Sequence, residues 1–168
     1  MFLVLDSIFG LPAHALVVHL AVIIVPLAAV AFIATGWRAH WRRAYSLPVA
    51  ILAVAGAGAS LMAAQTGGPL ESMVRNAARS AGTGARFGEH PENGNTAELF
   101  AIVLAVAAVA FWAVDRYGER WKLPRWAPVG AYAVAVVPAV IALVTMAVAG
   151  HSGAQLVWKD VGTFTVAR

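Results

Sequence analysis

The chain contains no cysteine among its 168 residues. That absence excludes disulfide bonds, thiolate zinc sites, iron–sulfur ligation and heme attachment through a CxxCH motif. Any metal bound by this chain must therefore take its ligands from histidine, carboxylate, methionine or backbone atoms.

Charged residues are scarce as well. They make up 12% of the chain, whereas 61% of its residues are hydrophobic, and soluble domains average about 25% charged residues. A chain this short cannot bury so much apolar surface in one core, so we expect the excess to face lipid. The basic residues stand in short loops beside apolar stretches, which argues against nucleic acid as a partner despite the net charge of +4.

Four stretches have no Asp, Glu, Lys or Arg in their interiors and are long enough to cross a bilayer, which requires about 20 residues of helix. A single charged residue at the centre of such a helix would cost about 2.5–3.5 kcal/mol. We place the four spans at residues 13–35, 47–65, 97–114 and 128–150. The sequence therefore predicts one all-α domain over residues 1–168, a polytopic membrane protein whose four helices form an up-down transmembrane bundle.

The segments outside the spans carry further structure. Pro69 suits the first turn of a helix, and apolar residues recur after it at helical spacing. We expect a short helix over residues 70–80, lying on the outer surface within the outer loop 66–96. The outer tail, residues 151–168, mixes polar and apolar side chains and is expected to rest on the membrane interface.

The two sets of connections differ in charge. Seven of the twelve Lys and Arg residues stand in two short segments, 37–46 and 115–126, which share one side of the membrane. The opposite side holds six of the eight acidic residues. The positive-inside rule counts Lys and Arg, and it places the short basic segments in the cytoplasm. We therefore predict a multi-pass protein of the bacterial plasma membrane with both termini on the extracytoplasmic side.

This topology brings four of the five histidines to the outer edge of the membrane, namely His14, His19, His90 and His151. Imidazole is a ligand for heme iron and for zinc, copper and non-heme iron. The alternative is that each imidazole makes an ordinary polar contact with lipid headgroups. The grouping favours a cofactor-binding site that draws on these four histidines.

His19 is the deepest of the four, five residues beyond His14 and so about 7.5 Å further along the helix. Five residues also turn a helix by about 140°, so His14 and His19 cannot hold one ion together. We expect His19 and His151 to be the principal pair, with His14 and His90 as a second pair or as supporting residues. Glu98, near the start of the third span, is a candidate metal ligand beside His19 and His151.

Two stretches frame the chain and contain three of these histidines. The sequence GLPAHALVVHLAV covers residues 10–22, and GHSGAQLVWKDVG covers residues 150–162. The first resembles the opening of the bacterial membrane domain family DUF2231, in which two histidines separated by four residues begin the first membrane helix. The second resembles that family's closing Gly-His-x-Gly-Gly-x-Leu-Val-Tyr signature. His90 matches a third family histidine, and Thr66-Gly67 also fits the family pattern.

The resemblance covers nearly the whole chain and implies a four-helix membrane domain. Some relatives are joined to a Rieske iron–sulfur domain, which implies a link to electron transfer. The chain departs from the family pattern at Ala15, where proline is common, at Leu20, where the family has an aromatic residue, and at Ala154, which replaces a glycine. These departures concern packing more than the candidate ligands.

Three functions are compatible with these features. The first is binding of b-type heme by the histidine site for electron transfer. The second is a non-heme site for zinc, copper or iron, and the third is an accessory or assembly role in a larger membrane complex without catalysis. The expected partner is the lipid bilayer, and a redox protein, a larger complex or a second copy stays open. The spans show no charge in their interiors and no inverted repeat, which argues against a transporter.

Overall fold

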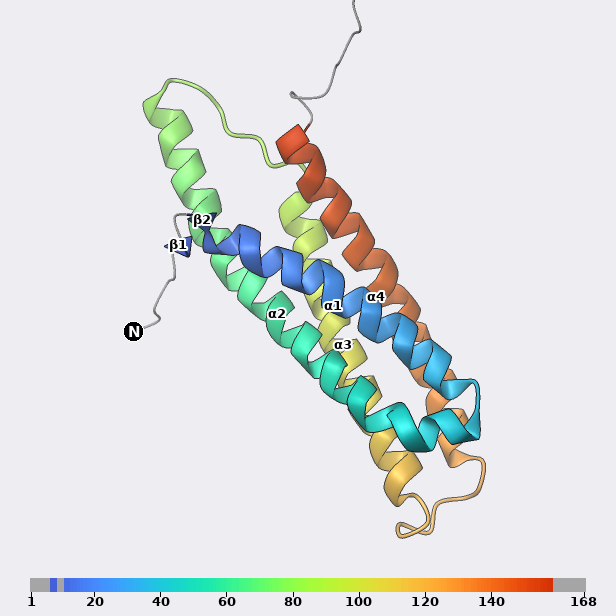
Figure 1. The fold of residues 1–168 in the computed structure, drawn as a ribbon. Helices are drawn as coiled ribbons and strands as arrows, with labels where there is room; N and C mark the ends of the chain where they lie inside the picture. The colour runs from blue at the N-terminus through green and yellow to red at the C-terminus, as the bar shows by residue number, and fades with distance from the viewer. Residues whose placement is uncertain (1–6, 9–10, 159–168) are drawn as a thin grey trace, which may run out of the picture.

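The computed structural model describes residues 7–8 and 11–158. Within them, four helices follow one another: α1 (Ala13–Gly36), α2 (Ala39–Ser80), α3 (His90–Tyr117) and α4 (Ala127–Trp158) (Figure 1). Two short strands, β1 (Ser7–Ile8) and β2 (Leu11–Pro12), pair antiparallel just before α1. All four helices are long and apolar enough to cross a membrane. The predicted all-α, four-span membrane fold is confirmed.

The interior of the bundle is built mostly from small residues. Ala28, Ala29, Ala139 and Ala142 are fully buried, and side chains this small let helix backbones approach closely. Large aliphatic side chains point outward instead, as at Ile23, which is 64% exposed. This distribution suits a bundle in lipid, where the surroundings are as apolar as the core and close packing supplies the attraction between helices.

The helices form a closed ring in chain order. Each packs against the next one along the chain, α1 also packs against α4, and α1 and α3 lie on a diagonal, where they meet through Phe32 and Phe111. The N-terminal ends of α1 and α3 therefore meet the C-terminal halves of α2 and α4 at one end of the bundle, which we name the histidine end because it contains His14 and His90. The opposite end, with Arg42 and the connection 118–126, we name the arginine end (Figure 1).

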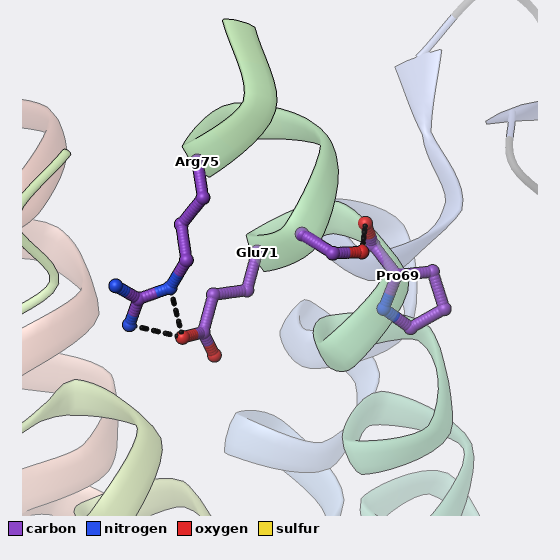
Figure 2. A network of polar contacts seen from close by, with 4 residues as sticks. Pro69, Glu71 and Arg75 are labelled. Carbon is purple, nitrogen blue, oxygen red and sulfur yellow. Dashed lines mark hydrogen bonds and ion pairs between the residues drawn. The ribbon is translucent and has the colours of Figure 1, made fainter. Parts of the chain in front are cut away.

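The second helix differs from expectation. Residues 70–80 are helical as predicted, but they continue α2 without a break and do not form a separate helix on the surface. Pro69 lies inside α2, and its carbonyl oxygen accepts a hydrogen bond from Ser72 Oγ at 2.8 Å. One turn further, Arg75 Nε donates to Glu71 Oε1 at 2.8 Å (Figure 2). The extension of α2 therefore projects beyond the bundle at the histidine end (Figure 1).

The segment that follows α2 returns toward the bundle. The Arg75 guanidinium lies over the ring of Phe87 at 4.9 Å, which ties this connection to the α2 extension. In α3, residues 90–96 are mostly polar and precede the apolar span that begins at Ala97. In α4, residues 151–158 continue the helix and do not belong to the predicted tail on the interface. The rest of that predicted tail, 159–168, lies outside the described residues.

The arginine end is tied together by two polar contacts. Arg42 Nε on α2 lies 3.5 Å from Asp115 Oδ1 on α3, with both side chains less than one fifth exposed. Tyr132 on α4 donates its hydroxyl to the carbonyl oxygen of Ile33 on α1 at 2.6 Å. The Tyr132 ring fills the space over Gly36, where a Cβ atom would come within 1.7 Å of the ring. The first contact joins α2 to α3 and the second joins α4 to α1, so each of the four helices takes part in one of them.

Candidate functional site

His14 is the second residue of α1, and its imidazole is fixed against α2. Its Nδ1 atom lies 2.9 Å from the carbonyl oxygen of Ala63. A carbonyl oxygen can only accept, so the proton belongs on Nδ1 and Nε2 is left as an unprotonated acceptor. Thr66 Oγ1 lies 3.4 Å from the same nitrogen. A Cβ atom at Gly67 would stand 3.1 Å from His14 Cε1, so the ring packs directly on this glycine.

His90 is the first residue of α3, and it is fixed in the same manner against α4. Its Nδ1 atom lies 3.1 Å from Ser152 Oγ. The Ser152 hydroxyl donates to the carbonyl oxygen of Ala149 at 3.0 Å, so its oxygen accepts from His90 Nδ1–H and Nε2 is again unprotonated. A Cβ atom at Gly153 would come within 2.8 Å of His90 Cε1, so the imidazole can occupy this place only beside a glycine.

The two imidazoles act on each other across the histidine end. His90 precedes the apolar span of α3, and burial lowers its pKa below the ordinary value of 6.5. The coulombic interaction with His14 lowers this pKa further, while a hydrogen bond to the Ala149 carbonyl raises it in part. At neutral pH, His90 is therefore neutral and its Nε2 lone pair is available to a ligand.

His19 and His151 have different surroundings. His19 is exposed on α1, and its Nδ1 is hydrogen-bonded to the carbonyl oxygen of Ala15 one turn earlier in the same helix. His151 is exposed on α4, and its Nε2 is hydrogen-bonded to the Gln155 amide at 2.9 Å. Glu98 is half-buried on α3. The structure thus holds His14 and His90, which were expected as a second pair or as supporting residues, between neighbouring helices. The roles of His19, His151 and Glu98 stay predictions.

The site supplies two imidazoles and few other metal ligands. Among residues 7–8 and 11–158, no group of three or more His, Asp or Glu side chains is arranged to hold a metal ion. Structural zinc sites take four protein ligands, and catalytic zinc sites take three.

Four residues of this site were not predicted as functional. They are the hydroxyl residues and glycines that hold the imidazoles, namely Thr66, Gly67, Ser152 and Gly153. Each pair forms a hydroxyl–glycine step three residues after an alanine whose carbonyl accepts a hydrogen bond. The signal in the sequence was the recurrence of this Ala-x-x-(Thr/Ser)-Gly pattern near the ends of the second and fourth spans.

The comparisons with known proteins agree with this architecture. Residues 10–165, nearly the whole chain, match the family described as "Predicted membrane protein (DUF2231)". No curated protein matches the chain, and no solved structure matches it.

Proposed function

The chain belongs to the DUF2231 family of multi-pass membrane proteins, and we propose that it binds a b-type heme through His14 and His90 for electron transfer. The observation that carries this proposal is that each imidazole uses Nδ1 to bind the neighbouring helix and leaves Nε2 free. Histidines that bind metals in proteins typically donate their other ring N–H to a carbonyl or a similar acceptor, which fixes their tautomer and orientation.

The number of available ligands favours heme over a bare metal ion. A porphyrin supplies four nitrogen atoms to its iron, so the protein needs to supply only two axial ligands. His14 and His90 come from α1 and α3, the two helices on the diagonal of the bundle, and each is held by the following helix, α2 or α4. Ligation between helices of a bundle is an ordinary way to hold such a group.

The number of protein ligands also indicates which chemistry the bound heme would support. If His14 and His90 both bound the iron, no coordination position would be left open for oxygen or a substrate. A group held in this way serves electron transfer, and its reduction potential depends on the hydrogen bonds and the burial of its ligands. Thr66, Ser152 and the carbonyls of Ala63 and Ala149 supply those hydrogen bonds here.

The distribution of Lys and Arg supports an orientation. Segments 37–46 and 115–126, at the arginine end, carry seven of the twelve basic residues, and short segments rich in Lys and Arg stay in the cytoplasm. We therefore assign the histidine end to the extracytoplasmic face of a bacterial plasma membrane. The redox partner would approach from that face.

The test is an absorption spectrum of the detergent-purified protein, first oxidised in air and then reduced with dithionite. We expect a Soret band when oxidised and sharp α and β bands after reduction. A featureless visible spectrum from protein expressed with ample heme supply would contradict the proposal.

Metal analysis of the same sample separates the alternatives. Iron in proportion to the Soret band supports heme. Stoichiometric zinc, copper or iron without a Soret band would identify a non-heme site instead. A protein that purifies without metal but together with another membrane protein would indicate an accessory subunit.

A further inference from the structure

The two halves of the bundle hold their histidines in equivalent ways. In the first half, a histidine in the first turn of α1 contacts an alanine carbonyl, a hydroxyl and a glycine of α2. In the second half, a histidine in the first turn of α3 contacts a hydroxyl and a glycine of α4, beside an alanine carbonyl. The equivalent pairs are His14 and His90, Ala63 and Ala149, Thr66 and Ser152, and Gly67 and Gly153.

The buried faces of α1 and α3 repeat in the same register. The offset that carries His14 onto His90 carries each buried position of α1 from Ala21 to Thr35 onto a buried position of α3, and no buried position of α3 is left over. The pairs are Ala21 and Ala97, Val25 and Ala101, Ala28 and Leu104, Ala29 and Ala105, Phe32 and Ala108, and Thr35 and Phe111. The register matches although most of the paired residues differ.

The second helices of the two halves agree as well. The offset that relates Gly67 to Gly153 also pairs every buried position of α4 with a position of α2. Four of these positions are buried in α2 as well, and the fifth, Ala149, pairs with the half-buried Ala63. The buried pairs are Val49 and Ala135, Ala53 and Ala139, Gly56 and Ala142, and Ser60 and Met146. A shared helical period alone would align the buried faces in some register, but it would not also align the histidine, hydroxyl and glycine of each half.

The ring order of the helices has the matching symmetry. The contacts of α1 with α2 correspond to those of α3 with α4, the contacts of α2 with α3 correspond to those of α4 with α1, and α1 and α3 lie on a diagonal. Both hairpins run from the histidine end to the arginine end and back. The two hairpins therefore form a direct repeat, related by an axis along the bundle. An inverted repeat is a different relation, in which the two halves have opposite orientations.

We infer that the protein is two equivalent helical hairpins, 13–80 and 90–158, related by a pseudo-twofold axis along the bundle, and that each presents one equivalent Nε2 atom, from His14 or His90, to a single site on this axis. Resting on the proposed function, the inference specifies its ligand as a planar metal macrocycle with two equivalent axial positions. Thr66 with Gly67, and Ser152 with Gly153, are the positioning residues of the two halves.

The test reads the tautomer of each histidine by two-bond ¹H–¹⁵N correlation spectra of the full-length protein labelled with ¹⁵N-histidine and reduced with dithionite. His14→Ala and His90→Ala variants assign the two resonances. We expect both imidazoles to carry their proton on Nδ1, whereas imidazole in water prefers Nε2–H. Ser152→Ala should shift His90 away from the Nδ1–H form and leave His14 unchanged, Ser152→Thr should restore it, and Thr66→Ala should act on His14 alone.

The outcomes separate this inference from the proposed function. Two Nδ1–H imidazoles in a protein without a Soret band support the equivalent halves and remove the heme proposal. A Soret band together with an Nε2–H tautomer at either histidine overturns the equivalence and leaves heme binding in place. An effect of Ser152→Ala on both histidines would also overturn it, because the halves would then not position their imidazoles independently.

Discussion

At the scale of single residues, the two glycines beside the imidazoles leave little room for a side chain. A Cβ atom at Gly153 would stand 2.8 Å from His90 Cε1, whereas none of the surrounding atoms lies within 4 Å of a Cβ placed at Gly68. Alanine in place of glycine favours a helix interior by about 0.8–1 kcal/mol. Any loss of heme binding caused by Gly153→Ala would therefore come from displacement of the His90 imidazole and not from a weaker helix.

We predict that Gly153→Ala lowers the amount of bound heme per protein at least several-fold, because the His90 ring must leave its place beside Ser152. Gly67→Ala should have a weaker effect, since its Cβ would stand 3.1 Å from His14 Cε1. Gly68→Ala is the matched control and should bind as the wild type does. Soret absorbance relative to total protein measures the effect. Equal binding by all three variants would show that the imidazoles of His14 and His90 do not hold the heme.

The protonation of His90 makes a second prediction at this scale. Protonated imidazole cannot bind a metal, and the pKa of His90 lies below 6.5 because of its burial and of His14. As the pH falls into the acidic range, protonation of His90 should release bound heme. A pH titration of the Soret band follows this release. Loss of the band at neutral pH in otherwise folded protein would contradict the prediction.

At the scale of secondary-structure elements, Gly36 decides how closely α1 approaches α4. The Tyr132 ring occupies the place of a side chain at this position, and overpacking of a well-packed site typically costs about 1–3 kcal/mol. We predict that Gly36→Ala destabilises the bundle by about this amount, measured by unfolding in detergent. Gly58→Ala, with open space at its Cβ, is the control and should not destabilise. Equal stability of the two variants would mean that Tyr132 moves aside without cost.

The ion pair at the arginine end should contribute more than the one on the α2 extension. Arg42 and Asp115 are 19% and 13% exposed, whereas Arg75 and Glu71 are 48% and 30% exposed. Exposed pairs one helical turn apart contribute about 0.3–0.5 kcal/mol. Double-mutant cycles in detergent should give a coupling of about 1 kcal/mol or more for Arg42 with Asp115, and a smaller value for the exposed pair. The reverse order would contradict this account of the arginine end.

The elements also show what local sequence can and cannot predict. The apolar spans were predictable because the cost of a charge in lipid constrains every residue of a span. The unbroken α2 was not, because two consecutive glycines and Pro69 are ordinary signals for a break. Proline removes one backbone donor but is compatible with a helix whose neighbours supply the remaining contacts. Here the extension beyond Pro69 is helical through Ser80.

At the scale of the whole molecule, the sequence and the structure favour different histidines at the same end of the bundle. Depth along the helix made His19 the leading candidate, yet depth does not determine the direction in which a side chain points. His19 is exposed, and His14 is packed against α2. The direction of each histidine depends on the rotation of α1 and α3 against their partners. That rotation is set by buried alanines throughout the bundle, which no local motif reports.

The pseudo-twofold relation explains why such a small molecule has two similarly held imidazoles. One hairpin presents one fixed histidine, and its repetition presents a second across the axis. The paired core positions have exchanged residues, as with Phe32 and Ala108, while the histidine, the hydroxyl group and the glycine persist in both halves. The symmetry therefore appears in the positions of the buried residues and in the residues of the site, whereas most of the paired core residues differ in type.

The most direct measurement for the central claim is low-temperature electron paramagnetic resonance of the oxidised, purified protein beside four single variants, His14→Ala, His19→Ala, His90→Ala and His151→Ala. The account predicts a low-spin ferric signal with two imidazole ligands in the wild type, retained in the His19 and His151 variants. In the His14 and His90 variants it should give way to a high-spin signal or to loss of the heme. A wild-type protein without heme, or a low-spin signal that depends on His19 and His151 instead, would contradict the account.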